Sequence, residues 1–254
     1  MLMSSVYEQL IENSSKGKKA FAVLLDPDKL DDRSLKSIVM LAMECRVDYF
    51  FVGGSLLSKY NISEIVQTIK QYTSIPVVLF PGSHLQVEPN ADAILFLSLI
   101  SGRNADFLIG QHVVAAPIVK QSKLEVLSTG YMLIDCGEQT TASYISNTTP
   151  LPYDKPSIAA ATALAGEMLG LKVMYLDGGS GAAKPVSAET IAAVKKAVHC
   201  PVIVGGGVNT EEKAFAALEA GADVIVVGTA IEKDPNLLVA ISNKVAGYSK
   251  SINA

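Results

Sequence analysis

The chain has 254 residues, of which 49% are hydrophobic and 18% are charged, and its formal net charge is -4. This length suits one (β/α) barrel domain spanning residues 1–254, and the hydrophobic content is enough for a large buried core. The acidic balance and the lack of a basic run argue against a nucleic-acid partner. The sequence holds no apolar run of about 18 residues and no secretory signal, so we expect a cytoplasmic protein without a transmembrane segment.

Eight short apolar runs rich in β-branched residues alternate along the chain with segments of helical periodicity. The predicted strands are residues 21–25, 49–52, 77–80, 93–97, 131–134, 173–176, 202–204 and 224–227. The predicted helices are residues 32–44, 63–72, 104–120, 156–169, 188–198, 211–220 and 235–246. This alternation predicts an α/β fold in which a parallel sheet closes into a single TIM-type (β/α)8 barrel.

Two connections depart from the regular repeat. Residues 81–92, between the third and fourth predicted strands, include two prolines and a glycine and are too few for a crossover helix. The barrel is therefore expected to lack a proper third helix. Residues 136–153 form a long loop after the fifth predicted strand. Loops of this length in a compact barrel are typical of active-site covers.

Glycine-rich segments follow the last three predicted strands. YLDGGSGA begins at Tyr175, VGGGVN at Val204 and VVGTA at Val226. Glycines let the backbone approach a ligand closely, and successive N–H groups together with the helix that follows form a site for anions. Barrels commonly bind phosphate after strands seven and eight. We therefore predict a phosphorylated substrate here, and expect that a side chain at Gly207 or Gly228 would push its phosphate away.

Oxygen-bearing side chains stand at the ends of the first two predicted strands. Asp26 lies in LLDPDK and Ser55 in FFVGGS. Hard oxygen ligands on neighbouring strand ends suit Mg²⁺, which completes its shell with water and substrate phosphates. An equally good interpretation is that Asp26 and Asp28 are only turn and cap residues. A metal across the barrel mouth from the phosphate loops would imply a second anionic group, such as a diphosphate.

The end of the sixth predicted strand offers two polar side chains on one face. Tyr175 and Asp177 are two positions apart, so both are expected to face the barrel mouth and hydrogen-bond a polyol. The alternative is a buried tyrosine that its neighbour satisfies. Asp135, at the end of the fifth predicted strand, is a weaker candidate because it can simply anchor the long loop.

The histidines and cysteines carry no metal-ligand spacing. They are His84, His112, His199, Cys45, Cys136 and Cys200. We expect structural roles for the histidines, with His112 and His199 on the wrong side of the barrel for catalysis. The cysteines are odd in number and far apart, so they are expected to be reduced thiols.

The motifs together resemble the geranylgeranylglyceryl phosphate synthase family. LLDPDK, FFVGGS, SLISGRN, YLDGGSGA, VGGGVN and VVGTA occur in the family's order over nearly the whole chain. The resemblance is closer to the group found in many methanogens and Bacteroidetes. It implies an Mg²⁺-dependent prenyltransferase that joins a prenyl diphosphate, expected to be geranylgeranyl diphosphate, to the C3 hydroxyl of sn-glycerol 1-phosphate. The product would be an ether-lipid precursor, and the enzyme a homo-oligomer, either a dimer or a hexamer.

The resemblance also implies roles for individual residues. It assigns Asp26 and Ser55 to the metal, and Asp177 and Tyr175 to catalysis. The residues that it assigns to glycerol 1-phosphate are Tyr175, Leu176, Asp177, Gly178, Gly179, Ser180, Gly181, Gly206, Gly207, Gly228 and Thr229. The prenyl chain is expected to lie between apolar walls in the space left by the missing third helix.

Two other functions fit the phosphate loops. One is a sugar-phosphate or amino-acid biosynthesis isomerase, for which Asp26 and Asp135 would supply acid and base. An aldolase fits less well, because no predicted strand carries a lysine for a Schiff base. The other is a non-catalytic sensor of a phosphorylated ligand.

Overall fold

The computed structural model describes residues 5–58 and 61–251. Eight parallel strands follow one another around a closed barrel, and the last pairs with the first. They are β1 Ala20–Leu25, β2 Tyr49–Val52, β3 Val77–Leu79, β4 Ala93–Leu99, β5 Glu125–Leu133, β6 Val173–Asp177, β7 Val202–Gly205 and β8 Val224–Val227. The predicted TIM-type barrel is confirmed.

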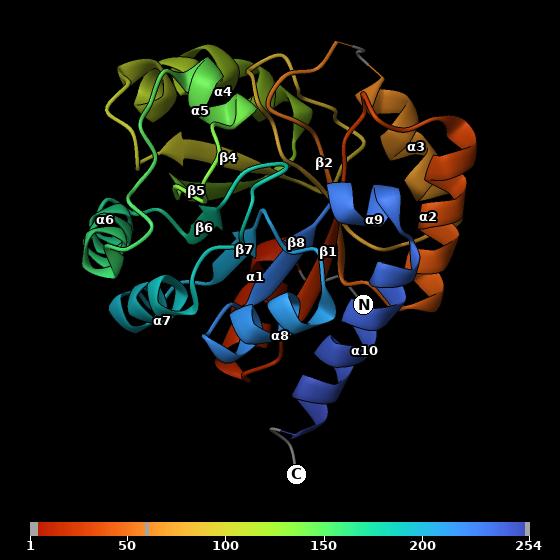
Figure 1. Cartoon of the computed structure of the whole chain (residues 1–254). Helices are drawn as coiled ribbons and strands as arrows, with labels where there is room; N and C mark the ends of the chain where they lie inside the picture. Colours follow the sequence, from red (N-terminus) through yellow and green to blue (C-terminus); the bar gives the residue numbers. More distant parts are fainter. Residues whose placement is uncertain (1–4, 59–60, 252–254) are drawn as a thin grey trace.

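Helices surround the barrel, as Figure 1 shows, with α2 and α3 on one flank and α6 and α7 on another. They are α1 Val6–Ser15, α2 Asp32–Glu44, α3 Ile62–Tyr72, η1 Asp106–Gly110, α4 Gln111–Ser122, α5 Thr141–Ser146, α6 Pro156–Met168, α7 Ala188–Ala197, α8 Glu211–Glu219, α9 Thr229–Lys233 and α10 Asn236–Ser251. Local capping explains several starts: the Ser187 hydroxyl accepts the N–H of Thr190, and Thr210 does the same for Lys213.

The core has two layers because successive strand residues point to opposite faces. Along β6, for example, Tyr175 packs inside the barrel, whereas Leu176 packs between the barrel and its helices. The same alternation along β2 puts Phe51 inside and Phe50 outside. Strand parity therefore decides which side chains reach the barrel interior.

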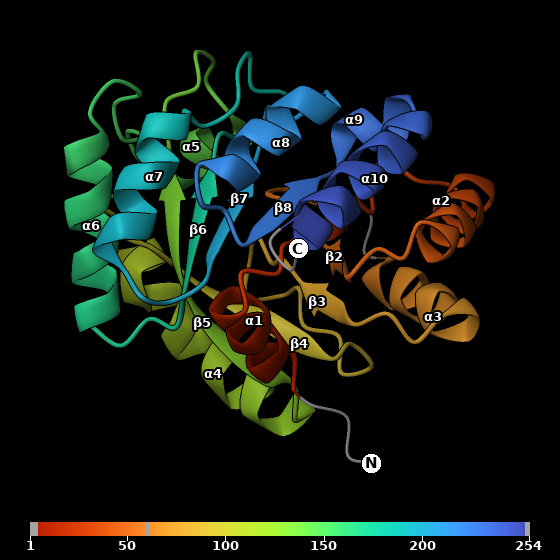
Figure 2. The ribbon, with the colours of Figure 1, turned by 90° about the horizontal axis from the view of Figure 1, so that it is seen from below.

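The first helix closes the lower end of the barrel (Figure 2). Val6 and Leu10 of α1 belong to the apolar cluster that fills the barrel interior. The Glu125 carboxylate accepts the N–H groups of Val6 at 2.6 Å and Tyr7 at 2.9 Å, so a negative charge caps the helix start. Ligand access is therefore left to the opposite end, at the carboxyl termini of the strands.

The connection between β3 and β4 lacks a helix, as predicted. Residues 80–92 are described throughout and form only turns and bends. Several elements differ from prediction, and two of the differences are at β5 and in the loop after it. β5 begins at Glu125 rather than at residue 131, because Glu125 and Ser128 interrupt the apolar pattern while pairing with β4 holds the backbone extended. The loop after β5 contains the short helix α5, which Thr140 caps. Within the described ranges, no helix has the length and hydropathy required to cross a bilayer.

Candidate active site

Two cavities open at the carboxyl ends of the strands. The polar cavity, of about 280 Å³, lies over β1, β6, β7 and β8. The apolar cavity, of about 120 Å³, lies among residues 80–87, β4, α4 and α5. Gly54, Ser55 and Phe80 line both, so the two cavities share a wall.

The polar cavity brings together most of the residues predicted for substrate and metal. Those on its wall are Asp26, Ser55, Tyr175, Asp177, Gly179, Ser180, Gly181, Gly206, Gly207, Gly228 and Thr229. Leu176 and Gly178 are not on this wall. Leu176 points into the outer core layer, and a Cβ at Gly178 would face the sulfur of Cys136. Each of these residues is one position away from Asp177, so each faces away from the cavity that Asp177 lines.

Two glycines of the phosphate loops lie where the protein backbone packs closely. Gly207 has φ of +69°, and a Cβ there would lie 2.5 Å from the carbonyl oxygen of Lys184. A Cβ at Gly228 would lie 3.0 Å from the carbonyl oxygen of Leu24. Both added side chains would meet protein backbone, so these glycines allow neighbouring loops to pack closely. The expected effect of a side chain on a bound phosphate stays a prediction.

Two N–H groups of the sixth-strand loop are already used within the protein. Gly178 donates its N–H to the carbonyl of Gly205 at 3.0 Å. Gly179 donates to Oδ1 of Asp177 at 2.6 Å. These bonds hold the loop and fix the carboxylate of Asp177 before any ligand binds.

The carboxylate of Asp177 is buried and has a second donor that the sequence prediction missed. Oη of Tyr131 lies 2.5 Å from Oδ2 of Asp177. Burial raises the pKa of Asp177, while the bonds from Tyr131 and Gly179 oppose that rise. Tyr131 pairs in register with Tyr175 across the β5–β6 ladder. Strand alternation could have found it, since a tyrosine beside Tyr175 on the same face must point into the barrel.

An aromatic group stands where the two cavities meet. The rings of Phe80 and Tyr175 are stacked with centroids 5.0 Å apart. Tyr131 meets both edge-on, at 5.8 Å from Phe80 and 5.6 Å from Tyr175. Packed rings keep water out and offer π faces to positive charge.

Lys29 and Glu232 are further site residues that sequence reasoning missed. Nζ of Lys29 lies 2.9 Å from Oδ2 of Asp26 and 3.2 Å from Oγ1 of Thr229. Glu232, from α9, reaches the same cavity with Oε2 3.9 Å from that ammonium. Burial raises the pKa of Glu232; Lys29 opposes the rise and the charge of Asp26 adds to it.

The donors near Asp26 fit Mg²⁺. Oδ1 of Asp26 accepts the N–H of Asp28 at 3.1 Å, so the turn role that we considered is real, and yet the same carboxylate lines the cavity. Ser55 adds a hydroxyl on the neighbouring strand end. In the described parts of the chain, no three His, Cys, Asp or Glu side chains cluster to enclose a metal. Mg²⁺ is usually bound through one or two carboxylates, with the rest of its shell from substrate phosphates and water, so it does not need such a cluster.

The apolar cavity lies where a regular barrel would have a helix connecting β3 to β4, as expected. Its wall includes Val87, Leu97, Phe107, Ala115 and Val119. This space arises because residues 80–92 cross the barrel rim without a helix to fill it. The wall is mainly apolar, which suits a hydrocarbon chain.

One histidine lies nearer the site than predicted. His112 lines the apolar cavity, with its ring edge-on to Phe96 at 4.6 Å, because α4 packs over the end of β4. Its placement on the wrong side of the barrel was therefore wrong. Burial lowers the pKa of His112, which favours the neutral ring. His84 also lines this cavity and pairs with Gln111 at 2.6 Å, whereas His199 is exposed far from both cavities.

Comparison with known protein families identifies the family of this chain. The PcrB family matches residues 13–245. The chain belongs to the PcrB family. It is 60% identical over 236 residues to the geranylgeranylglyceryl phosphate synthase of Spirosoma linguale, covering 93% of this chain and 95% of that protein. It is 52% identical over 242 residues to that of Chitinophaga pinensis, covering 95% and 96%.

A solved structure of the same kind superimposes closely. It is the crystal structure of (S)-3-O-geranylgeranylglyceryl phosphate synthase from Thermoplasma acidophilum in complex with its substrate sn-glycerol-1-phosphate. The TM-score is 0.90 with 32% identity, covering 96% of this chain and 99% of that one. The resemblance inferred from the motifs is confirmed, including its closeness to Bacteroidetes members.

Asp135 does not join the site of this PcrB family member. Its side chain is exposed, and Oδ1 accepts the N–H of Gly137 at 3.1 Å within its own loop. Asp26 lies in the polar cavity, whose wall does not include Asp135. The pair of carboxylates required for the isomerase hypothesis is therefore not assembled, and Asp135 only anchors the loop, as we considered.

Proposed function

We propose that this protein transfers a prenyl group from a prenyl diphosphate, geranylgeranyl diphosphate being favoured, to the C3 hydroxyl of sn-glycerol 1-phosphate. The observation that carries the proposal is the shared wall between a polar, glycine-rich cavity and an apolar one. One cavity suits a small phosphorylated polyol and the other a hydrocarbon chain. The names of the relatives and the substrate in the Thermoplasma acidophilum structure support the same activity.

In the reaction, the bond from the allylic carbon to the diphosphate oxygen breaks and a bond from that carbon to the glycerol oxygen forms. Diphosphate leaves with the bonding electron pair. The glycerol hydroxyl gives up its proton, for which the carboxylate of Asp177 is the buried acceptor on the polar wall. Tyr175, on the same wall, orients the polyol.

The aromatic group protects the reacting carbon. Phe80, Tyr131 and Tyr175 lie at the boundary between the cavities, where that carbon must sit if its chain is in one cavity and its acceptor in the other. Their faces stabilise developing positive charge, and their packing excludes water that would otherwise capture it.

We further propose that Asp26 and Ser55 hold Mg²⁺. When bound, the ion supplies positive charge that offsets the charge developing on the diphosphate. The loops with Gly207, Gly228 and Thr229 are proposed to hold the glycerol phosphate on the other side of the same cavity. In this arrangement the diphosphate and the glycerol phosphate bind on opposite sides of the cavity, and the allylic carbon and the glycerol hydroxyl lie near Asp177.

A prenyl-transfer assay tests the activity. The protein is supplied with geranylgeranyl diphosphate, Mg²⁺ and either sn-glycerol 1-phosphate or its 3-phosphate enantiomer. We expect the prenylglyceryl phosphate to form with at least about a tenfold preference for the 1-phosphate, because one mispaired buried polar group costs roughly 1–3 kcal/mol. Equal rates with both enantiomers would contradict the site, and phosphate binding without product would favour the sensor hypothesis.

We also propose that the chain assembles as a homodimer or a hexamer. η1 and α4 expose a run of apolar side chains: Ile109 at 61%, Val113 at 68%, Val114 at 54% and Ile118 at 48%. A surface patch of exposed apolar side chains is typical of a protein–protein interface. Light scattering coupled to size exclusion gives the mass; a monomer at micromolar concentration would contradict this proposal.

A further inference from the structure

Lys29 joins the two halves of the polar cavity. Its ammonium forms an ion pair with Asp26, the proposed metal ligand, and donates to Thr229, in the proposed phosphate loop. It also faces Glu232 at 3.9 Å. One lysine charge therefore stands between two carboxylates at the edge of the phosphate site.

Glu232 has a carboxylate oxygen without a hydrogen-bond partner in the described part of the chain. Its side chain is 10% exposed and lines the polar cavity. Among the residues that the structure describes, Oε1 is buried and has no hydrogen-bond partner. A buried carboxylate oxygen without a donor is unfavourable, so this orientation points to a cationic ligand.

The charges of the cavity lead to the same conclusion. Its described acidic residues are Asp26, Asp177 and Glu232, against the cationic Lys29 and Lys233. Two phosphorylated substrates would add several negative charges. Lys233 and a Lys29 that is shared by two carboxylates do not offset them, whereas a divalent cation bound to Asp26 would free Lys29 for a phosphate.

We propose that Glu232 is a second carboxylate of the divalent-cation site, and that Lys29 is a resident counter-cation that the metal displaces from Asp26. This inference rests on the proposed function, because it takes Asp26 as the metal ligand. Displacement leaves the ammonium beside Thr229, where it is free to pair with a phosphate in the phosphate loop. Metal binding and phosphate binding are thereby linked through one side chain.

Binding of Mn²⁺ to the protein without substrates tests this, followed by electron paramagnetic resonance of the free ion. The variants are Asp26→Asn, Glu232→Gln and Lys29→Met. The matched control is Glu219→Gln, which makes the same carboxylate-to-amide change at an exposed position of α8. Thermal melting by circular dichroism checks folding. Since Lys29 has a side chain 40% exposed, its methionine variant is expected to fold even if Glu232→Gln does not.

We expect Glu232→Gln to weaken Mn²⁺ binding by about fivefold or more, since it removes one of two facing charges. Lys29→Met should tighten binding by about threefold or more, because a competing cation is gone. A purely structural role for either residue would not produce this tightening. Mn²⁺ affinity within twofold of wild type in a folded Glu232→Gln, or unchanged or weaker affinity in Lys29→Met, would overturn the inference. Unchanged affinity in Asp26→Asn would instead remove the metal assignment of the proposed function.

Discussion

Oη of Tyr131 donates a 2.5 Å hydrogen bond to Oδ2 of Asp177, and the two residues face different cavities. Tyr131 lines the apolar cavity and Asp177 the polar one. Both side chains are nearly inaccessible to solvent. The hydrogen bond thus crosses the boundary at which the new carbon–oxygen bond is proposed to form, and it opposes the rise that burial causes in the pKa of the proposed base.

Replacing Tyr131 with phenylalanine should change both the rate and its pH dependence. The phenol opposes the rise that burial causes in the pKa of Asp177, so its loss raises that pKa further. A base acts when deprotonated, so kcat falls as the pH drops through its pKa, and the acidic limb should move to higher pH. We expect kcat to fall by roughly 10–100-fold, the value of a buried hydrogen bond to a charged group.

The measurement is kcat against pH at saturating substrates, with Tyr144→Phe as the control because Tyr144 is 71% exposed. If Tyr131→Phe keeps the wild-type acidic limb, Asp177 is not the group that titrates in the rate. Its role would then be limited to orienting the glycerol.

Replacing Gly207 with valine should act on the binding of glycerol phosphate. Its positive φ and the 2.5 Å approach to the Lys184 carbonyl mean that a side chain must move the loop after β7 or the loop after β6. We expect KM for glycerol 1-phosphate to rise by at least about tenfold with a smaller change in kcat. Gly247→Val is the matched control, since a Cβ there meets nothing within 4 Å. A normal KM in Gly207→Val would show that the loop does not hold the phosphate.

The fold was predictable from the sequence because apolar runs and helical periodicity are local signals. The absence of a helix between β3 and β4 followed from the length and prolines of residues 81–92. The predicted strand ends placed Asp26, Ser55 and Asp177 at one end of the barrel. Contacts between distant segments were not predictable. Lys29 meets Thr229 across 200 positions of the chain, and nothing near Glu232 in the sequence indicates that α9 turns it into the cavity.

Filling the apolar cavity should shorten the prenyl chain that is accepted. Ala115 is 7% exposed on α4, and its methyl group lines that cavity. Ala115→Phe should reduce kcat/KM for the C20 diphosphate by about tenfold or more and leave shorter chains less affected, because overpacking a closed wall costs roughly 1–3 kcal/mol. A series of prenyl diphosphates measures this, with Ala116→Phe on the exposed side of α4 as the control. Equal losses for all chain lengths would mean that the tail lies elsewhere.

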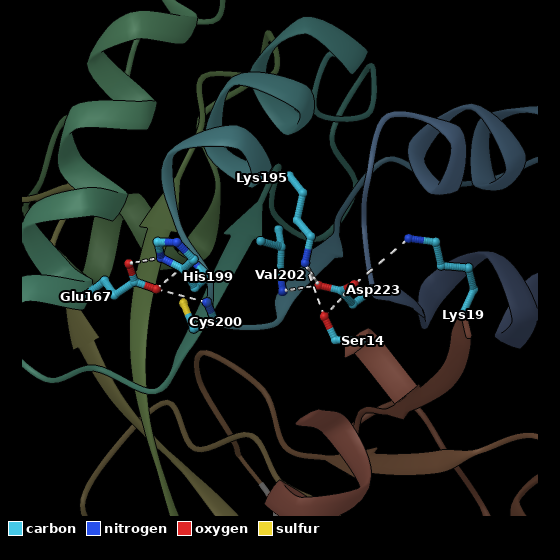
Figure 3. A network of polar contacts seen from close by, with 8 residues as sticks. All are labelled: Ser14, Lys19, Glu167, Lys195, His199, Cys200, Val202 and Asp223. Carbon is cyan, nitrogen blue, oxygen red and sulfur yellow. Dashed lines mark hydrogen bonds and ion pairs between the residues drawn. The ribbon is translucent and has the colours of Figure 1, made fainter. Parts of the chain in front are cut away.

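The buried network at the lower end of the barrel should contribute to the stability of the fold and have no effect on the kinetic constants (Figure 3). The carboxylate of Asp223 accepts from Ser14 at 3.0 Å, Lys195 at 2.6 Å and the N–H of Val202 at 2.8 Å. Lys19, with a side chain 8% exposed, lies 3.9 Å away. The network ties α1 and α7 to the starts of β7 and β8.

Asp223→Asn keeps the shape of this side chain but leaves Lys19 buried without its opposite charge. Breaking a buried pair costs about 3–5 kcal/mol, so Tm should fall by roughly 6–20 °C in a chain of this size. Lys19→Met should cost much less, because Asp223 retains Lys195 and the hydrocarbon replaces a buried charge. Differential scanning calorimetry gives both values, and KM for glycerol 1-phosphate should stay at the wild-type value below the transition. A Tm for Asp223→Asn equal to that of Lys19→Met would mean that the unpaired lysine is not the source of the loss.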